Sequence, residues 1–501
     1  MKKICQSLPF LLAVITTRAQ SNYVAILPSD TEQEIVRKAA NVVPTPRQLR
    51  WQQLELTAFF HFGVNTFTDK EWGDGTEDEK IFNPTKLDAN QWIRVCKKAG
   101  IKQVILTVRH HDGFCLWPSK YTEHSVKNSP WENGKGDVVK EVAEACKNQN
   151  MGFGIYLSPW DRNSKLYGTD AYNDYFVHQL TELLTHYGRI DEVWFDGANG
   201  EGPNGKKQVY AFDRWYKVIR TLQPAATIAI MGPDVRWVGT ESGYGREQEW
   251  SVVPVSALSA ETVAKNSQTS VDIKFSGDMT ADVLGSREKI RSAKALAWYP
   301  AETDVSIRPG WFYHQKEDSE VKSPEKLMDI YYNSVGKNSV LLLNIPPDRE
   351  GLLSDADVKS LLGWRALRDS IFKDNLVKRS MLQIPASKQD VPLLDDGNVQ
   401  TGITLKETGG EYIVQLKLDA PRSFNILQLQ EEISKGQRVE SFVLEGFQGG
   451  RWEKITEGST IGYKRILKFK ACTTDQVRLR ITSSRLQPTL AEMGLYHSLK
   501  N

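Results

Sequence analysis

The sequence predicts an α/β fold: a (β/α)8-like barrel, regular or irregular, followed by a C-terminal all-β sandwich. From residue 57, short apolar runs alternate with amphipathic stretches, which is the pattern of strand–helix units around a parallel sheet. From residue 376, segments of alternating apolar and polar residues are separated by Gly, Asp, Asn and Ser turns, which favours antiparallel strands. The length of 501 residues leaves room for a barrel and a second domain.

Seven buried strands and five amphipathic helices are expected in the first part of the chain. The strands are expected at 57–63, 102–111, 152–159, 190–197, 226–232, 294–302 and 339–347. The helices are expected at 88–100, 137–150, 171–188, 208–223 and 323–336. No glycine-rich G-x-G-x-x-G turn follows the first strand, which disfavours an open dinucleotide-binding sheet. The connection from Gly232 to about Ser292 is long and irregular, as functional loops on barrels often are.

The patterns divide the chain into four parts. We expect a signal peptide at 1–20, the barrel at 21–355, a connecting helix at 356–375 and the β-sandwich at 376–501. The sandwich resembles the galactose-binding-like domains that accompany such barrels. It is expected to bind sugar, to complete the substrate groove, or to act as a stabilising partner.

The first twenty residues, "MKKICQSLPFLLAVITTRAQ", have the features of a secretory signal. They combine a basic start, an apolar run from Leu8 to Ile15 and a small residue, Ala19, near the end. The run is too short to span a bilayer. We therefore expect an exported protein, periplasmic or secreted; the alternative is a cytosolic chain with a buried first helix.

Composition excludes several classes of partner and cofactor. Lysine and arginine total 64 against 62 aspartates and glutamates, so the chain lacks the basic excess of a nucleic-acid-binding protein. Cys96 and Cys146 lie on the apolar sides of expected helices and are interpreted as plain buried thiols. The cysteines show no metal-ligand spacing. Neither a metal nor a cofactor is expected, and the sequence makes no prediction of an oligomeric state.

Polar and titratable residues follow the expected strands, where barrel enzymes place their chemistry. Asp196 follows the apolar run from Val193 to Phe195, so its carboxylate is expected at the mouth of the barrel. By itself, Asp196 before Gly197 is equally compatible with a turn. The other strand-end groups are His61, His110, His111, Ser158, Trp160, Asp161, Pro233, Asp234 and Glu302.

A carboxylate at this position can attack or stabilise a developing cation. Glycoside hydrolysis needs a second carboxyl group, about 5 to 5.5 Å away in retaining enzymes and about 6.5 to 9.5 Å away in inverting ones. The candidates are Glu241, Glu247 and Glu249, all in the long connection. Adjacent residues such as His110 and His111 point to opposite faces of a strand, so they make a poor shared metal site.

Six motifs together resemble the α-L-fucosidases of glycoside hydrolase family 29. They are "FFHFGVNTF", "EWGDG", "VRHHDGFCLWPS", "GFGIYLSPWD", "EVWFDGANG" and "LLLNIPPDREGLL", and the resemblance covers roughly residues 45 to 355. Two further stretches, "GPDVRWVGTESGYGREQEWS" and "AWYPAETDVSIRPGWFYH", resemble the branch restricted to α-1,3 and α-1,4 fucosyl linkages in branched glycans.

The resemblance implies a retaining mechanism through a covalent fucosyl-enzyme, with fucosylated oligosaccharides or glycoconjugates as substrates. Asp196 matches the nucleophile and Glu241 the general acid/base. Thr240 stands where the branch has Asn before this glutamate, so Glu247 and Glu249 remain alternatives. The residues that the resemblance places around the fucose are His61, Glu71, Trp72, His110, His111, Tyr156, Trp194, Arg236 and Trp311.

Two alternative functions stay open from the sequence. The same pocket without turnover would make a fucose-binding, lectin-like protein, and the same barrel could act on another sugar. For Tyr156 and Trp311, plain structural packing is the alternative to substrate contact.

Overall fold

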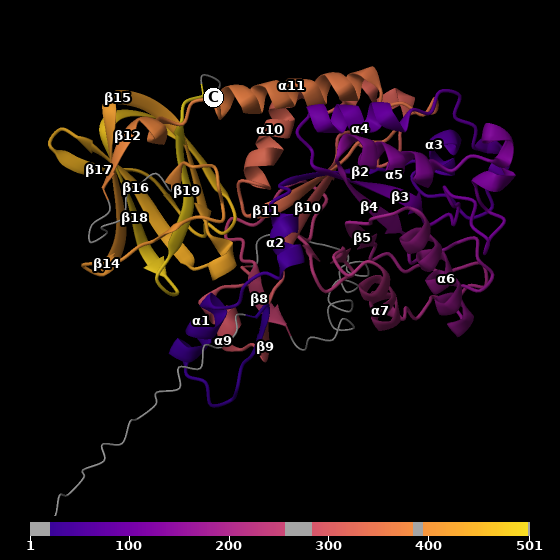
Figure 1. The fold of residues 1–501 in the computed structure, drawn as a ribbon, viewed down its shortest axis with the longest axis horizontal. Helices are drawn as coiled ribbons and strands as arrows, with labels where there is room; N and C mark the ends of the chain where they lie inside the picture. The colour runs from indigo at the N-terminus through magenta and orange to yellow at the C-terminus, as the bar shows by residue number, and fades with distance from the viewer. Residues whose placement is uncertain (1–20, 256–282, 384–393, 499–501) are drawn as a thin grey trace, which may run out of the picture.

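The computed structural model describes residues 21–255, 283–383 and 394–498. The expected signal peptide lies outside them. A barrel with outer helices occupies one side of the molecule and an antiparallel β region the other, and helix α11 (Asp355–Ile371) runs across the top (Figure 1). The order of strands and helices confirms the predicted fold class.

Eight parallel strands form the barrel sheet, and β6 and β7 are its two edges. In sheet order they are β6 (Thr227–Ile230), β5 (Glu192–Phe195), β4 (Gly152–Leu157), β3 (Gln103–Arg109), β2 (Leu56–Phe60), β11 (Ser339–Asn344), β10 (Ala301–Ser306) and β7 (Arg236–Trp237). The edges meet at an isolated parallel bridge between Ala229 and Val235. The sheet is therefore nearly closed.

The prediction of a single strand at 294–302 was wrong, because two strands of different sheets occupy this stretch. Residues Ala295–Trp298 form β9, which joins β1 (Tyr23–Ala25) and β8 (Val252–Val255) in a small antiparallel sheet. Barrel strand β10 begins only at Ala301, after Pro300. Proline has no N–H for a ladder, so the chain can leave one sheet at this point and enter another.

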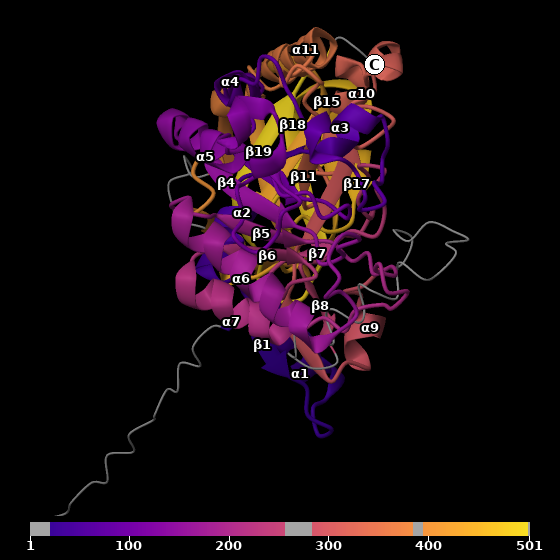
Figure 2. The same ribbon diagram turned by 90° about the vertical axis from the view of Figure 1, so that its right-hand side faces the viewer.

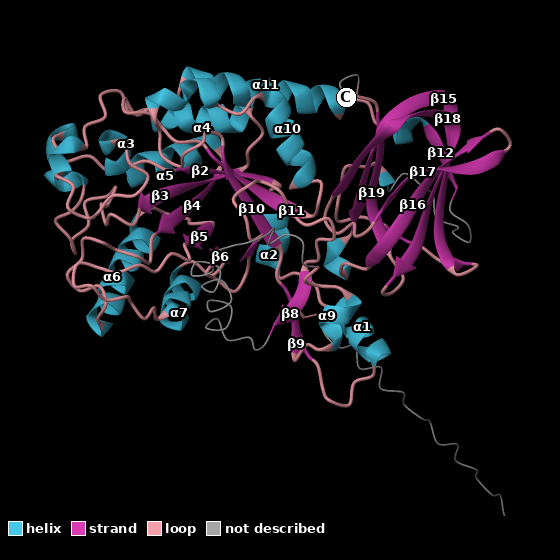
Figure 3. Ribbon diagram, turned by 180° about the vertical axis from the view of Figure 1, so that it is seen from behind, coloured by secondary structure: helices cyan, strands magenta, loops and turns pink. Residues whose placement is uncertain are grey.

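Helices cover the outside of the barrel (Figures 2 and 3). The five expected helices are confirmed as α4 (Ala89–Lys98), α5 (Val138–Gln149), α6 (Asp170–His186), α7 (Phe212–Leu222) and α10 (Pro324–Asn333). In α5, Val138, Val142 and Cys146 recur every four residues and are buried. Shorter helices precede or flank the barrel: α1 (Glu32–Ala40), α2 (Pro46–Gln52), α3 (Val64–Thr68) and α9 (Arg287–Arg291).

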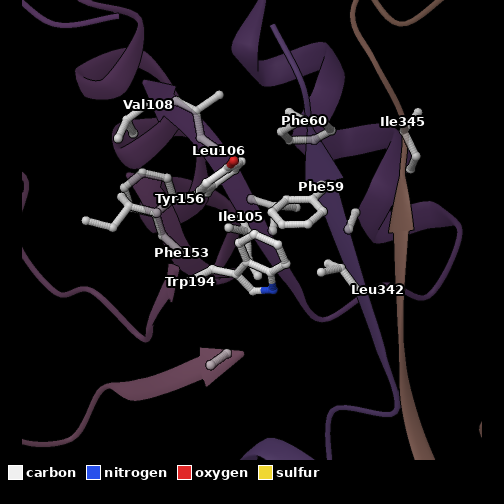
Figure 4. Packing of buried hydrophobic residues seen from close by; sticks show 14 of the residues in the cluster. Phe59, Phe60, Ile105, Leu106, Val108, Phe153, Tyr156, Trp194, Leu342 and Ile345 are labelled. Carbon is white, nitrogen blue, oxygen red and sulfur yellow. The ribbon is translucent and has the colours of Figure 1, made fainter. Parts of the chain in front are cut away.

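Aromatic side chains fill the barrel interior just below the site. Phe59, Tyr156 and Trp194 come from three different strands and pack together (Figure 4). Their ring centroids are 4.9 Å apart for Phe59 and Trp194 and 4.8 Å apart for Tyr156 and Trp194. Close packing of large, fully buried rings fixes their orientation, so the polar tips of Tyr156 and Trp194 are held in place.

The C-terminal part is an antiparallel sheet that encloses a hydrophobic core of its own. Two long strands, β15 and β18, pair along most of their length, with register shifts where they bend. The strands are β12 (Ser380–Gln383), β13 (Ile403–Thr404), β14 (Glu407–Thr408), β15 (Glu411–Glu431), β16 (Val439–Gln448), β17 (Arg451–Gly458), β18 (Arg465–Ser484) and β19 (Thr489–Tyr496).

Candidate active site

Asp196 stands at the carboxyl end of β5, inside the rim of the barrel. Its Oδ2 accepts a hydrogen bond of 2.9 Å from the hydroxyl of Tyr156, and its Oδ1 accepts one of 2.6 Å from the backbone N–H of Ala198. Burial, together with the charge of Asp196, raises the pKa of Tyr156, so this hydroxyl stays protonated and donates. The carboxylate is thus oriented from two sides and remains partly open to solvent, with its side chain 26% exposed.

Three histidines line the rim next to Asp196. Burial lowers the pKa of His61 and of His111 to about 4, and it lowers the pKa of His110 as well. His111 Nε2 lies 4.0 Å from Asp196 Oδ2. The imidazoles are therefore neutral near pH 7 and can both donate and accept hydrogen bonds, as a polyhydroxylated ligand requires.

Each histidine ring is held by a hydrogen bond or a stack. Nδ1 of His61 lies 2.8 Å from Asn344 Oδ1, and Nδ1 of His111 lies 2.8 Å from Ser158 Oγ. The rings of His110 and His111 pack at a tilt of 36° with centroids 4.1 Å apart, so the expectation that they point to opposite faces was wrong, because β3 ends at Arg109 before both of them. Nδ1 of His110 is buried and has no hydrogen-bond partner among the described residues. Such an atom is suited to bind a ligand, because leaving it unpaired is costly.

Trp194 contributes an aromatic ring to the site, and a hydrogen bond fixes the orientation of this ring. The indole N–H donates a 2.7 Å hydrogen bond to Glu302 Oε1, so the ring cannot turn freely. Burial raises the pKa of Glu302 well above its usual range, and no ion pair with this carboxyl is formed within the described part of the chain. The ring of Trp194 consequently forms an apolar wall beside Asp196.

Glu241 is brought to the same rim by a loop that follows β7 along the edge of β10. Val238 N–H donates to Glu302 O at 2.9 Å, and Gly243 N–H donates to Asp304 O at 3.1 Å. Gly243 has a φ of +79°, and a Cβ at this position would lie 2.9 Å from Ile330 Cγ2 and 3.0 Å from Val305 Cγ1. A glycine is therefore required for the loop to lie this close to the barrel.

The carboxyl group of Glu241 lies under Trp311, whose indole N–H donates to Oε2 at 3.2 Å. Desolvation raises the pKa of Glu241, the hydrogen bond from Trp311 lowers it, and the negative charges of Asp196 and Glu71 raise it further. The net shift is upward, which favours the protonated form. A shift in this direction is the one that a general acid requires.

The two alternative glutamates are engaged elsewhere. Glu249 is buried in ion pairs with Arg236 and Arg246. Glu247 pairs with Arg465 of the β region and, at 3.0 Å, with Lys337. Their charges are balanced by cations, whereas that of Glu241 is not balanced in any ion pair of the described residues. The geometry therefore favours Glu241.

Arg236 lies beside this loop rather than in contact with the two acids. Besides the Glu249 ion pair, its Nε donates to Tyr299 O at 2.9 Å and its Nη2 to Trp250 O at 3.1 Å. Trp237, the next residue, donates to Asp304 at 2.7 Å. Neighbouring residues of a strand point to opposite faces, which accounts for the outward course of Arg236.

Glu71 and Trp72 enter the rim from the loop after α3. Trp72 is 57% exposed and packs edge-on against His111 and Trp160. Glu71 accepts hydrogen bonds from the backbone N–H groups of Trp311, at 2.8 Å, and Phe312, at 3.2 Å. Trp311 is partly buried between these groups and His61, with the Trp311 and His61 ring centroids 5.2 Å apart.

Sequence reasoning missed three residues that support the site. Asn344 bonds to His61 and donates to Trp311 O at 2.8 Å, which links two expected ligand-binding residues. His314 and Asp69 join Glu71 in a hydrogen-bonded group. Asn344 lies inside the predicted strand at 339–347 and ends the observed strand β11, so its place at the rim appears only in the structure. The partnership of Asp69 with His314 left no local signal, because 245 positions separate the two residues.

Comparison with known proteins identifies the family to which this chain belongs. The family model for α-L-fucosidases matches residues 30–364. The chain belongs to the α-L-fucosidase family. The fucosidase is 42% identical over 466 residues to α-L-fucosidase 1 of Arabidopsis thaliana. This match covers 91% of this chain and 87% of the plant protein. Retention of anomeric configuration, a property of this glycoside hydrolase family 29, follows from membership.

Solved structures share the fold over nearly the whole fucosidase. A candidate α-L-fucosidase from Bacteroides ovatus is 49% identical with a TM-score of 0.84, and the match covers 96% of this chain and 78% of that one. A family 29 fucosidase from Ruminococcus gnavus, solved in complex with fucose, is 30% identical with a TM-score of 0.80 over 91% of this chain and 95% of that one.

The fucosidase is therefore a glycoside hydrolase that acts on fucose-containing substrates. A non-catalytic lectin-like protein and a barrel glycosidase for another sugar lose their support. In the described ranges, no helix is both long and apolar enough to cross a membrane.

Proposed function

We propose that the enzyme removes terminal fucose from α-1,3 and α-1,4 linkages of branched glycans, with Asp196 as nucleophile and Glu241 as general acid/base. One observation carries the catalytic part of the proposal. Asp196 and Glu241 face one rim, one hydrogen-bonded as a carboxylate and the other with a pKa shifted upward, while Glu247 and Glu249 are held in ion pairs.

The reaction has two steps. In the first, Asp196 attacks the anomeric carbon while Glu241 gives its proton to the glycosidic oxygen, and the bond between that carbon and that oxygen breaks. In the second, Glu241 takes a proton from water, the water oxygen attacks the anomeric carbon, and the bond to Asp196 breaks. Two inversions give net retention.

The neutral histidines, Tyr156 and Trp194 suit a sugar with several hydroxyl groups and one methyl group. His61, His110 and His111 offer hydrogen-bonding atoms that carry no charge, and Trp194 offers an apolar face. For Arg236 to bind the substrate, either the sugar must reach the arginine or the loop that holds the arginine must move. Export through residues 1–20 would bring the enzyme to extracellular glycans.

The linkage preference is supported by the loop after β7 and by residues 308–314, which together form the leaving-group side of the rim. Trp311 bonds to Glu241 there, and Trp72 is exposed across the rim. A leaving group must fit between these rings. Such a fit discriminates among linkages, because linkage position changes the direction in which the rest of the glycan leaves the fucose.

Fucose release from a linkage panel tests this specificity. We expect kcat/KM for Lewis-type trisaccharides with α-1,3 or α-1,4 fucose to exceed that for α-1,2 and α-1,6 fucosides by about 100-fold, the upper range of discrimination by shape. An aryl fucoside serves as the linkage-independent reference. Comparable kcat/KM across all four linkages would refute the restricted specificity and leave the fucosidase activity untouched.

A further inference from the structure

His314 lies between two carboxylates at the edge of the site. Its Nδ1 is 2.7 Å from Asp69 Oδ1, and its Nε2 is 2.7 Å from Glu71 Oε1. Ionised carboxylates only accept hydrogen bonds, so both ring nitrogens must donate. The geometry therefore describes an imidazolium with two anionic partners, unlike the neutral histidines of the pocket.

Glu71 transmits this arrangement to Trp311. Glu71 Oε2 accepts from Trp311 N–H and Oε1 from Phe312 N–H, so one carboxylate binds the histidine and the loop backbone together. A Cβ at Gly310 would lie 2.6 Å from Glu71 Oε1 and 3.0 Å from His314 Cδ2. Glycine at this position is what lets the carboxylate approach the loop.

We propose that Asp69, His314 and Glu71 form a charged clamp that holds residues 308–314 against the barrel and so positions Trp311 over Glu241. His314 is a positioning residue, because it acts through Glu71 and the loop. The catalytic consequence rests on the proposed role of Glu241. Loosening the clamp frees the Trp311 ring, and the wall on the leaving-group side loses its shape.

The surroundings of His314 are both acidic and basic. Glu317 raises the pKa of His314 and accepts from Gly310 N–H at 3.1 Å. Arg308 donates to the backbone oxygen of His314 at 3.4 Å, and Arg349 lies 3.8 Å from Asp69 Oδ1. Lys316, in the short helix η4 (Gln315–Glu320), also lowers the pKa of Asp69.

The balance of these groups fixes the sign of the pH dependence. Burial lowers the pKa of His314, but the hydrogen bonds from its ring to Asp69 and Glu71 outweigh burial and raise it. A group with a raised folded-state pKa gives its full stabilisation at low pH and loses it as pH rises through that pKa. The contribution of His314 to the clamp is therefore fully present below the ordinary pKa of histidine and is lost as pH rises through the raised pKa.

The test separates this opening from the titration of the general acid. In a Glu241→Gln background, kcat/KM is measured on an aryl fucoside with an activated leaving group, from about pH 5 to about pH 9, which brackets histidine titration. Such a leaving group needs no proton, so a remaining alkaline limb reports another group. We expect that limb to persist in Glu241→Gln and to vanish when His314→Gln is added, with kcat/KM lowered roughly tenfold below the limb.

A second variant keeps the proposal testable if His314→Gln folds poorly. Asp69→Asn removes one anion, so the pKa of His314 falls and the alkaline limb should move to lower pH. Exposed His186, at the end of α6, supplies the matched control, and His186→Gln should leave the limb unchanged. Hydrogen exchange should quicken at the Trp311 and Phe312 amides in the clamp variants alone, at unchanged melting temperature.

Two results would overturn the proposal: an alkaline limb that survives in the double variant, or a limb that Asp69→Asn leaves in place. Failure of the Glu241 assignment gives a different result. Glu241→Gln would then cleave oligosaccharides as fast as the parent enzyme, while the aryl-fucoside measurement would still report on His314.

Discussion

At the scale of single residues, the site is organised by the contrast between neutral and charged groups of similar type. Burial lowers the pKa of His61 and His111, whereas in His314 the hydrogen bonds to Asp69 and Glu71 outweigh burial and raise the pKa. Asp196 and Glu241 also lie in different surroundings, since a tyrosine hydroxyl donates to Asp196 and desolvation raises the pKa of Glu241. Environment rather than residue type assigns the role of each group.

The role of Asp196 can be tested by removing its carboxylate. Asp196→Ala should lower kcat by about 1,000-fold or more, because no nucleophile remains at the anomeric carbon. Added azide should restore turnover and give a fucosyl azide of inverted configuration, which NMR of the product detects. The matched control is Asp213→Ala on the exposed side of α7, with expected parent-like activity. Near-normal cleavage of a Lewis-type trisaccharide by Asp196→Ala would contradict the assignment.

At the scale of elements, the loop after β7 is the part on which catalysis depends most. It carries Glu241 and lies against β10 through backbone hydrogen bonds of Val238 and Gly243. Two residues of β7 close the barrel. A small shift of this loop moves Glu241 without moving Asp196, whose strand β5 is separated from β7 by β6 where the barrel closes.

Two glycines of this loop offer a matched pair of variants. Gly243→Ala forces a Cβ into the left-handed region and against Val305 and Ile330, at a cost of about 1 to 2 kcal/mol. We expect kcat/KM on oligosaccharides to fall roughly tenfold, with a smaller loss on an aryl fucoside that needs no general acid. Gly245→Ala meets its nearest atom at 3.3 Å and should stay close to the parent enzyme. Equal effects of the two changes, or equal losses on both substrates, would contradict this account.

Sequence patterns predicted the strands and helices that are long and periodic, but they missed elements of only a few residues. The apolar runs around Phe59, Val193 and Leu342 announced buried strands because a parallel barrel buries both faces of a strand. Strand β7 escaped notice because two residues show no period. Asp196 was placed by its strand, whereas Glu241 needed the fold, since only the ion pairs of its neighbours distinguish it.

At the scale of the whole molecule, the β region supports the catalytic rim from behind. Gln437 donates to Glu249 O at 2.9 Å and accepts from Ser251 N–H at 2.7 Å. Arg465 donates to Glu247 O at 2.7 Å and forms an ion pair with its side chain. The long connection that carries Glu241 is thus fastened to the β region through residues 247–251. This favours the interpretation of the β region as a stabilising partner.

A buried ion pair across the two regions should contribute measurably to stability. Lys464 lies 2.7 Å from Glu55; burial raises the pKa of Glu55, but Lys464, Lys102 and Tyr463 together outweigh burial and lower it. Lys464→Met removes the main cationic partner of the partly buried Glu55 and should cost about 3 kcal/mol in the free energy of unfolding, measured by urea denaturation. The exposed pair of Lys86 and Glu350 is the control, where Lys86→Met should cost at most about 1 kcal/mol.

The pH dependence of this difference checks its origin. Because the pKa of Glu55 is lowered in the folded state, the stabilisation is present above the ordinary pKa of a glutamate and is lost as pH falls through the lowered value. The free energies of unfolding of the parent enzyme and of Lys464→Met should therefore converge in strong acid. A gap that stays constant down to that pH would show that packing, and not charge, is responsible.

The hydrogen bonds between residues 247–251 and the β region limit how domains can be exchanged between enzymes of this family. Exchanging the C-terminal region between relatives would replace Gln437 and Arg465 along with everything else, so a chimera would inherit a proton donor whose supporting loop no longer has its partners. Successful shuffling would have to carry this short segment together with the region that holds it, making the inheritable module discontinuous in sequence although contiguous in space.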